Sequence, residues 1–215
     1  MDSEPTVHII DDDPAVRHAL TTLMRSMRLQ AESHESAQQL LDKLDPSQPG
    51  CLLLDVRMPG MSGLELLERL GQADVHLPAI VMSAYGDVPM VVRAMKAGAL
   101  NFLEKPCRDQ QLWEALQEAL KWDAAHRREL ALRAKLRRRL QHLTPGEHAV
   151  LRLLIDGRPN KEIAEELGLS VRTIEVRRSK LMKKMKADSL AELVRATLTA
   201  DPDYVERPAA PTRKA

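Results

Sequence analysis

Short apolar runs alternate with amphipathic segments along the first 120 residues of the chain. The runs have the length and apolar density of buried parallel strands, and they lie at Val7–Asp11, Ala31–His34, Leu52–Asp55, Ala79–Ser83 and Asn101–Leu103. Each intervening segment opens on a residue that favours a helix N-cap, namely Asp13 before Pro14, Ser36, Ser62 or Asp87. This alternation predicts an α/β fold with an open, doubly wound, five-stranded parallel sheet.

A long helix is predicted after this sheet. No Gly or Pro occurs between Pro106 and Pro145, so Asp109–His142 is expected to be one helix about 50 Å long. Leucines recur at helical spacing near both of its ends, at positions 112, 116 and 120 and at positions 132, 136 and 140. We expect this helix to continue as a linker, with its leucine stripe either packed on its own domain or forming a dimer seam.

The last third predicts a small all-α domain. Thr144-Pro-Gly-Glu147 has the pattern of a capping box, and Asn160 and Ser170 are expected to cap two helices separated by a glycine-containing turn. Helix, turn and helix in this order are typical of a helix-turn-helix. A final helix is expected after Ser189, and three prolines after Asp201 predict a mobile tail. The predicted boundaries are 1–122, 123–143, 144–200 and 201–215.

Charge divides the chain in two although the formal net charge is only +1. Residues 1–120 hold 10 basic and 18 acidic side chains, whereas residues 121–215 hold 22 and 13. This asymmetry indicates two domains with different partners, the basic one facing a polyanion. No apolar run approaches the ~18 residues of a membrane span, and two cysteines suit a reduced compartment. We therefore expect a cytoplasmic protein with no membrane partner.

Polar residues follow the predicted strands at one edge of the sheet. Asp11 and Asp12 follow the first strand, and Asp55, Ser83 and Lys105 follow three others. The carboxyl ends of parallel strands converge at the site where such sheets bind ligands. Clustered carboxylates favour Mg²⁺, and a carboxylate can attack a phosphoryl group whose charge a metal and a lysine neutralise. Any one of these aspartates is an ordinary helix cap, but the set together predicts a phosphoryl-transfer site.

Four segments resemble the receiver domain of response regulators: I-I-D-D-D, L-L-L-D-V-R-M-P-G-M-S-G, I-V-M-S-A-Y-G-D-V and F-L-E-K-P. The resemblance covers about residues 5–122 and implies a flavodoxin-like fold with Asp55 as phosphoacceptor. It implies Mg²⁺ bound by Asp12, Asp55 and the backbone carbonyl of Arg57, with Asp11 acting through water. It also implies a phosphoryl-binding Lys105 joined to Pro106 by a cis bond, and two switch residues, Ser83 and Phe102.

This sequence departs from the receiver pattern in two mild ways. Ser83 stands where Thr is commoner and Phe102 where Tyr is commoner.

The sequence also admits two functions other than that of a phosphorylated response regulator. The triplet Asp11-Asp12-Asp13 is similar to the nucleophile motif of haloacid-dehalogenase-like phosphatases, but Ala15 and the loop after Asp55 do not fit those enzymes. A receiver-fold regulator that works without phosphorylation is the other alternative. We expect a regulator and not an enzyme.

The second helix of the predicted helix-turn-helix, Val171–Lys186, holds seven Lys or Arg residues and one Glu. Helical spacing gives it an apolar face of Val171, Ile174, Leu181 and Met185, and Arg178, which interrupts this face, is expected to turn outward toward a phosphate. A recognition helix needs such a core face beside polar and cationic faces. The alternative is a solvated basic face, and RNA binding is disfavoured because this half has few aromatics.

The stretch L-T-P-G-E, followed by G-R-P-N-K-E-I-A-E-E-L-G-L-S-V-R-T-I-E-V-R-R-S-K-L-M-K-K-M, resembles the LuxR-type DNA-binding domain. The whole chain thus resembles NarL/FixJ-family two-component response regulators, and G-D-V-P-M-V-V-R-A-M-K-A-G-A places it nearest the FixJ-like branch. This resemblance implies that a sensor histidine kinase phosphorylates the chain and that the chain binds double-stranded promoter DNA as a homodimer. It also allows RNA polymerase as a partner. Base contacts are expected from Glu175, Val176 and Ser179, and phosphate contacts from Lys161, Arg172, Arg177, Lys180 and Lys184.

The predicted linker is more basic than the DNA-binding domain as a whole. Residues 121–143 hold 8 basic and 2 acidic side chains, whereas residues 144–199 hold 11 and 8. The linker is therefore expected to contact either the DNA backbone or the acidic receiver domain.

Overall fold

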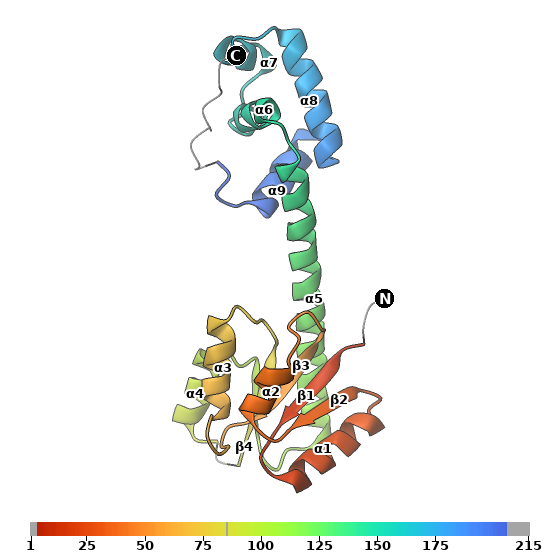
Figure 1. Cartoon of the computed structure of the whole chain (residues 1–215), viewed down its shortest axis with the longest axis vertical. Helices are drawn as coiled ribbons and strands as arrows, with labels where there is room; N and C mark the ends of the chain where they lie inside the picture. The colour runs from red at the N-terminus through yellow and green to blue at the C-terminus, as the bar shows by residue number, and fades with distance from the viewer. Residues whose placement is uncertain (1–3, 85, 206–215) are drawn as a thin grey trace. The chain divides into compact units, whose positions relative to one another are not determined.

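The structure, a computed structural model, describes residues 4–84 and 86–205, and the chain divides into two compact units. Figure 1 shows the order of the helices and strands. The first unit ends at Arg127 and the second begins at Arg128. Helix α5 (Asp109–Gln141) contributes residues to both. Each unit has its own hydrophobic core.

The described part of the first unit contains a five-stranded parallel sheet in the order β2-β1-β3-β4-β5. Its strands are β1 (Thr6–Ile10), β2 (Gln30–His34), β3 (Gly50–Asp55), β4 (Ala79–Ser83) and β5 (Asn101–Glu104). The fold predicted from the apolar runs is confirmed. Every residue of β4 is buried, as expected for a strand covered on both faces. Strand order reverses between β1 and β3, which places a crevice at their carboxyl ends.

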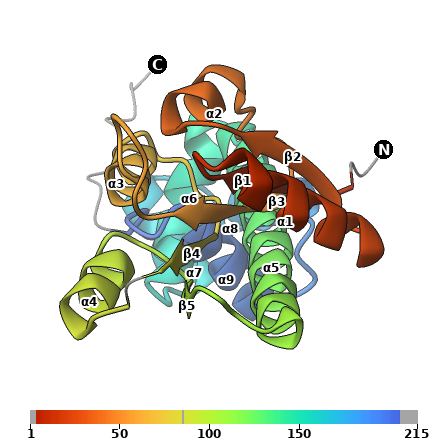
Figure 2. The same ribbon diagram turned by 90° about the horizontal axis from the view of Figure 1, so that it is seen from below.

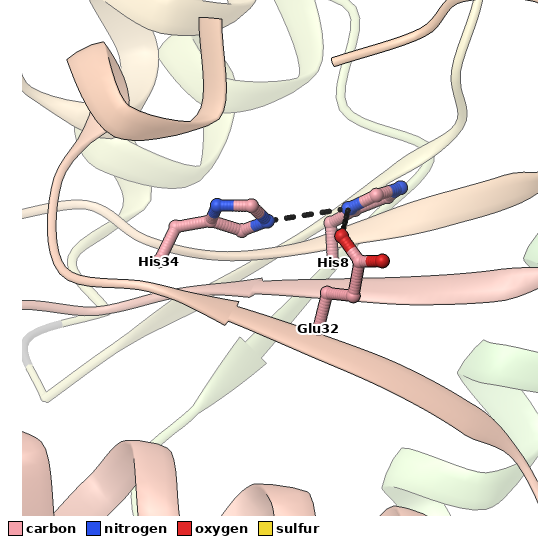
Figure 3. Close-up of side chains that lie close together, drawn as sticks. All are labelled: His8, Glu32 and His34. Atoms are coloured by element: carbon pink, nitrogen blue, oxygen red, sulfur yellow. Dashed lines mark hydrogen bonds and ion pairs between the residues drawn. The ribbon is translucent and has the colours of Figure 1, made fainter. Parts of the chain in front are cut away.

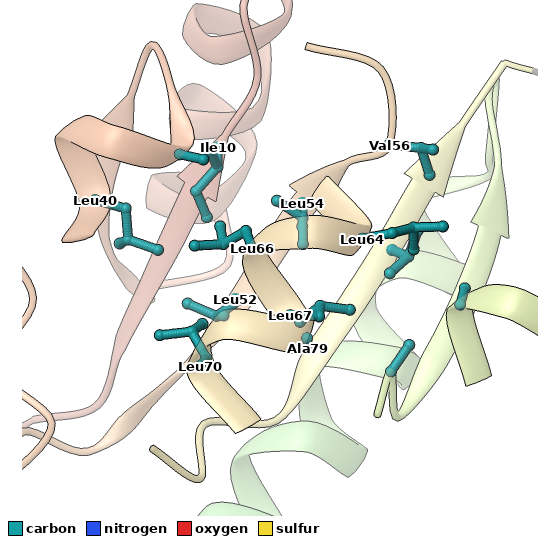
Figure 4. Close-up of a cluster of buried hydrophobic side chains, with 14 of the residues drawn as sticks. Ile10, Leu40, Leu52, Leu54, Val56, Leu64, Leu66, Leu67, Leu70 and Ala79 are labelled. Atoms are coloured by element: carbon teal, nitrogen blue, oxygen red, sulfur yellow. The ribbon is translucent and has the colours of Figure 1, made fainter. Parts of the chain in front are cut away.

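Helices cover both faces of this sheet (Figure 2). Helix α1 (Pro14–Ser26) and the first part of α5 pack on one face, whereas α2 (Ala37–Lys43), α3 (Gly63–Gln72) and α4 (Val88–Lys96) pack on the other. Alternate residues of β1, β3, β4 and β5 supply the two cores. Figure 4 shows the core under α2 and α3, with the labelled side chains Ile10, Leu40, Leu52, Leu54, Val56, Leu64, Leu66, Leu67, Leu70 and Ala79.

The predicted helix starts of this unit are confirmed by hydrogen bonds. In each case a side-chain oxygen accepts from a backbone N–H of the first turn, and the four capping residues are Asp13, Ser36, Ser62 and Asp87. Ser62 forms a full capping box with Glu65. These caps fix the point at which each helix leaves the carboxyl edge of the sheet.

Helix α5 is the predicted long helix and has 33 residues. Leu112 and Leu116 are buried against the sheet, and Leu136 and Leu140 are buried in the core of the second unit. Between them Leu132 is 49% exposed. Both ends of the leucine stripe therefore pack in the cores of their own units.

Polar contacts fasten α5 to the loop that precedes β3. The Arg127 guanidinium donates 2.9 Å hydrogen bonds to Asp123 and further hydrogen bonds to the backbone carbonyls of residues 46–48. The buried Asp123 carboxylate also accepts the backbone N–H of Gly50 at 3.1 Å. These contacts extend the first unit beyond residue 122, to Arg127.

The described part of the second unit is helical. It contains the end of α5, α6 (Pro145–Ile155), α7 (Asn160–Leu167), α8 (Val171–Met185) and α9 (Leu190–Ala200). Gly168 lies between α7 and α8 with φ +63°, a left-handed conformation that favours glycine. The Ser170 side chain caps α8. The predicted helix-turn-helix is thus formed by α7, this turn and α8.

Two local predictions about α7 and α8 are wrong. Asn160 is the first residue of α7 and not its cap, because Pro159 occupies the cap position. The Asn160 side-chain oxygen instead accepts a 3.2 Å hydrogen bond from Arg178, so Arg178 joins α8 to α7, and its contact with a phosphate stays a prediction. Val171 is 41% exposed, so the core face of α8 consists of Ile174, Leu181 and Met185.

The segment after α9 is docked where a mobile tail was expected, at least up to Val205. Tyr204 is 5% exposed and belongs to the core of the second unit. Its hydroxyl lies 2.6 Å from His148 Nδ1, and the Arg152 guanidinium lies over its ring. The rest of the predicted tail, residues 206–215, lies outside the described residues. Among the residues that are described, no helix combines the length and apolar character needed to cross a bilayer.

Candidate functional site

Polar side chains from four neighbouring strands gather at the carboxyl edge of the sheet. Asp11 follows β1, Asp55 ends β3, Ser83 ends β4 and Lys105 follows β5. Because these strands are parallel and adjacent, the four positions lie at one edge, beside the crevice between β1 and β3. Asp11 and Ser83 are buried.

The Lys105 ammonium joins the buried Asp11 carboxylate to the partly buried Asp55 carboxylate. Its Nζ donates a 2.6 Å hydrogen bond to Asp11 Oδ2 and another of 2.6 Å to Asp55 Oδ1. Burial alone would lower the pKa of Lys105, but the hydrogen bonds and charges of the two carboxylates outweigh it, so this pKa is raised. Lys105 therefore stays protonated and offsets the repulsion between the two aspartates.

Backbone donors orient the same two carboxylates. Asp55 Oδ2 accepts the N–H of Arg57 at 2.6 Å, and Asp11 Oδ1 accepts the N–H of Asp13 at 2.9 Å. The Lys105 N–H donates to the Ser83 carbonyl at 2.8 Å, and the Lys105–Pro106 peptide is cis, as predicted. The site is thus held by the backbone of its own strand ends.

The other predicted residues of this edge lie around it. The Asp12 side chain is exposed and lines a hollow with Arg57, Met90 and Arg93. Phe102 is half-buried and packs against the core under α3 and α4. An added Cβ at Gly86 would lie 3.3 Å from the Phe102 ring, so this segment passes close to the ring.

The residues gathered here fit Mg²⁺. Asp11, Asp12 and Asp55 supply carboxylate oxygens, and Arg57 supplies a backbone carbonyl in the turn that follows Asp55. Hard oxygen ligands of this kind suit Mg²⁺, which keeps several waters and binds phosphate oxygens beside one or two carboxylates. Lys105 provides one positive charge for the cluster, and a divalent cation would supply the rest.

Most of the residues predicted to contact DNA lie on helix α8 of the second unit, with exposed side chains. Arg172, Glu175, Val176, Ser179 and Lys180 are all exposed on this helix. Lys161, on α7, is exposed as well. The Arg172 guanidinium lies 3.5 Å from Glu175, so the two form a weak pair at the surface. The geometry of α8 therefore suits a helix that reads a groove.

Two predicted phosphate contacts have partners within their own unit. Lys184 Nζ donates a 2.6 Å hydrogen bond to Glu147, whose side chain is 5% exposed, and another of 3.2 Å to the His142 carbonyl. Burial raises the pKa of Glu147, but hydrogen bonds from Lys184 and Thr144 outweigh it, so this pKa is lowered. The Arg177 guanidinium lies over Gly146, where an added Cβ would be 2.8 Å away. Both side chains hold α8 against the start of α6.

Both units match described protein families. The family "Response regulator receiver domain" matches residues 7–117, and the family "Bacterial regulatory proteins, luxR family" matches residues 141–197. The chain is 47% identical to the transcriptional regulatory protein FixJ of Azorhizobium caulinodans, over 90% of this chain and 92% of that protein. It is 40% identical to the response regulator protein TodT of Pseudomonas putida, over 91% and 86%.

The chain belongs to the FixJ-like response regulators. Solved structures agree. The response regulator StyR matches with a TM-score of 0.83 and 42% identity over 91% of this chain and 98% of that one. Full-length FixJ from B. japonicum matches with a TM-score of 0.56 and 40% identity over 92% and 98%. Membership establishes a transcription regulator with a receiver domain and a LuxR-type DNA-binding domain.

The aspartates that resemble a phosphatase motif do not have that arrangement in this response regulator. Asp13, the second aspartate that such a motif requires, caps α1, and its Oδ1 accepts the Ala15 N–H at 2.7 Å. The family found for the chain is one of transcription regulators. Asp13 thus has a structural role at the start of α1.

Sequence reasoning missed two residues that shape the receiver site. Gly63 starts α3 so close to β3 that an added Cβ would lie 2.2 Å from the Asp55 carbonyl oxygen. The glycine that follows the Ser62 cap was the available signal. Arg17, near the start of α1, donates a 2.8 Å hydrogen bond from Nη1 to the carbonyl of Asp11, which precedes the helix. Its position on the inner side of α1 could be read only from the fold.

Proposed function

We propose that Asp55 of this response regulator accepts a phosphoryl group from a sensor histidine kinase, and that the phosphorylated chain controls transcription as a homodimer bound to promoter DNA through α8. The observation that carries this proposal is the Lys105 ammonium, 2.6 Å from both Asp11 and Asp55. It places a fixed positive charge beside a carboxylate at a sheet edge suited to ligands.

In the proposed reaction, a carboxylate oxygen of Asp55 attacks the phosphorus of a phosphohistidine. The new P–O bond forms as the P–N bond breaks, and the kinase histidine leaves with the electron pair of that bond. Lys105 offsets charge on the phosphoryl oxygens as they approach Asp55. Mg²⁺, held by Asp11, Asp12, Asp55 and the Arg57 carbonyl, would neutralise further charge on the same oxygens.

The switch proposed for this domain uses Ser83 and Phe102. Ser83 ends β4, the strand next to that of Asp55, and we propose that its hydroxyl hydrogen-bonds the phosphoryl group. Such a bond would favour a receiver state in which Phe102 turns inward and α4, β5 and α5 present a changed surface. This surface would favour the dimer.

Replacing the phosphoacceptor tests the receiver half of the proposal. Asp55→Asn removes the nucleophilic oxygen at nearly constant volume, so incubation with Mg²⁺ and acetyl phosphate should no longer add the mass of a phosphoryl group. Asp74→Asn is the matched control, because the Asp74 side chain is 94% exposed at the end of α3 and should leave labelling unchanged. Labelling of Asp55→Asn at the wild-type level would refute the assignment of Asp55.

For the DNA-binding half, we propose that Glu175, Val176 and Ser179 contact base edges, and that Lys161, Arg172 and Lys180 contact phosphates. Arg177 and Lys184 would act chiefly by holding α8 on α6.

Lys180→Ala should weaken binding to duplex DNA of any sequence and lower the slope of log K against log[salt] by about one unit. The exposed lysine of α2, in Lys43→Ala, is the control. An unchanged slope in Lys180→Ala would remove it from the phosphate contacts.

A two-fold dimer would place two copies of α8 in successive major-groove segments of a promoter. Light scattering of the chain with and without acetyl phosphate tests this: the mass should double on phosphorylation, and a monomer in both states would refute the dimer. Contact with RNA polymerase and a cytoplasmic location are further parts of the proposal.

A further inference from the structure

Two histidines and a glutamate lie together on the edge of the receiver sheet, outside the phosphorylation site. His8 is on β1, and Glu32 and His34 are on β2, the neighbouring edge strand. His8 pairs in register with Glu32, and His34 lies two residues further along β2. All three side chains therefore project from the same face of the sheet.

The nitrogen and oxygen atoms of these side chains converge (Figure 3). His8 Nδ1 lies 3.3 Å from His34 Nε2 and 3.9 Å from a carboxylate oxygen of Glu32. One ligand atom from each residue lies within 4.8 Å of the other two. Two nitrogens that each bind a tetrahedral Zn²⁺ at 2.0–2.1 Å are separated by about 3.3 Å. The two imidazoles thus have the spacing of a metal-binding pair.

We propose that His8 Nδ1, His34 Nε2 and the Glu32 carboxylate bind one divalent transition-metal ion of the Zn²⁺ class. Two imidazoles and one carboxylate, with water in a fourth position, form an established zinc ligand set. Mg²⁺ would not compete well, because it prefers an octahedron of oxygens. This site is independent of the proposed function of Asp55.

Burial and protonation favour this ligand set. His8 is 6% and His34 2% exposed. Burial lowers the pKa of both, and burial together with the charge of His8 brings that of His34 to about 4. Both rings are therefore neutral near pH 7, the form that binds metals. The Glu32 side chain is 62% exposed, so it gives an ion a path from solvent and a charge to attract it.

A direct His8–His34 hydrogen bond is the competing explanation, since it also places the two nitrogens about 3 Å apart. That bond does not satisfy His34 fully. Its Nδ1 is buried without a hydrogen-bond partner among the described residues. Because the metal would bind Nε2, this Nδ1 would lack a partner in both explanations. Metal binding would place the proton of each ring on the nitrogen that faces away from the ion. It would also join the edge strand β2 to β1.

Zn²⁺ titration of the full-length, untagged chain tests the site. The protein is stripped with a chelator, exchanged into buffer with saturating Mg²⁺ to fill the acidic pocket, and titrated by calorimetry. We expect one Zn²⁺ per chain, and Co²⁺ in its place should show the intense visible bands of a four-coordinate ion. Zn²⁺ should also raise the Tm of the receiver unit.

Variants separate this site from the other histidines. His8→Gln should abolish binding, and Glu32→Ala should weaken it by at least about tenfold. His18→Gln, on the exposed surface of α1, and the exposed Glu35→Ala are matched controls that should bind as wild type. If His8→Gln does not fold, Glu32→Ala decides alone, because its side chain is exposed. Wild-type Zn²⁺ affinity in Glu32→Ala, or no Zn²⁺ uptake by the wild type, would leave the histidines as a hydrogen-bonded pair and overturn the proposal.

Discussion

A single lysine pairs with two aspartates at the receiver site and offsets only one of their two negative charges, which makes a prediction about Mg²⁺. Lys105→Met keeps the length of the side chain but leaves the carboxylates of Asp11 and Asp55 without the ammonium that lies 2.6 Å from each. In EDTA the variant should lose about 3 kcal/mol of stability, as expected when one partner of a mostly buried ion pair is removed. Mg²⁺ should then raise its Tm by more than that of the wild type.

The measurement is thermal unfolding with and without Mg²⁺, followed by the fluorescence of the tryptophans, Trp113 and Trp122, both on α5. The exposed Lys121→Met serves as the control, because it removes a charge from α5 away from the strand ends. If Mg²⁺ raised the Tm of Lys105→Met and of the wild type by the same amount, Lys105 and Mg²⁺ would not be neutralising the same carboxylates.

His148 predicts how the second unit responds to acid. Burial, and then the charge of Arg152, lower the pKa of His148 below its ordinary value of 6.5. As pH falls below about 6.5, the unfolded chain takes up a proton that the folded chain resists, so the second unit should lose stability. His148→Gln should flatten this dependence of stability on pH. Hydrogen exchange of α6 at pH 7 and at pH 5, corrected for the intrinsic exchange rates, measures the change in stability, and an equal change in His148→Gln and the wild type would contradict the prediction.

At the scale of elements, the end of the receiver unit depends on one arginine of α5. The Arg127 guanidinium spans Asp123 and the carbonyls of residues 46–48. Arg127→Ala should therefore raise hydrogen exchange both in the loop before β3 and in α5 near residue 127. The stability lost should be about 1–3 kcal/mol, because the buried Asp123 carboxylate keeps only its bond from Gly50. Arg128→Ala is the control, because Arg128 is the exposed neighbour of Arg127. Protection that stays unchanged in Arg127→Ala would show that other contacts end the unit.

Elements with a strong local signal could be predicted from the sequence, and those fixed by distant contacts could not. The strands were visible because burial on both faces makes them continuously apolar, and the caps because Asp13, Ser36, Ser62 and Asp87 act within one turn. Likewise the receiver residues stand next to strand ends. By contrast, the docking of Tyr204 on His148 joins positions 56 residues apart. The pairing of Lys184 with Glu147 is similarly remote, so charge alone indicated a phosphate contact.

At the scale of the whole chain, the structure assigns part of the basic charge of the linker to internal contacts. Arg127 binds within the first unit, while Arg139 Nη1 donates to the Met185 carbonyl at 3.0 Å and Arg137 donates to that of Ala200 at 3.4 Å. Arg133 forms a 2.7 Å ion pair with Glu129 on α5 itself. Arg127 thus makes the expected contact with the receiver unit, whereas Arg137 and Arg139 stabilise the second unit.

These contacts make the end of α5 part of the DNA-binding unit, which predicts where the chain can be cut. Leu136, Leu140 and Leu143 are each less than 10% exposed in the core of the second unit. A fragment of residues 128–215 should therefore unfold cooperatively. A fragment of residues 144–215 lacks these three leucines, whose burial contributes on the order of 5 kcal/mol, and should be largely unfolded or melt at a much lower temperature.

Two substitutions in the longer fragment separate the role of core packing from that of helix length. Leu140→Ala should cost about 2–5 kcal/mol, the usual cost of truncating a buried leucine. Leu132→Ala should cost little, because Leu132 is 49% exposed on the same helix. Circular dichroism during heating measures both, and at about 4–8 °C per kcal/mol for a domain of this size the difference is large. If residues 144–215 melted at the temperature of residues 128–215, the end of α5 would be only a linker, and the boundary of the DNA-binding domain would return to residue 144.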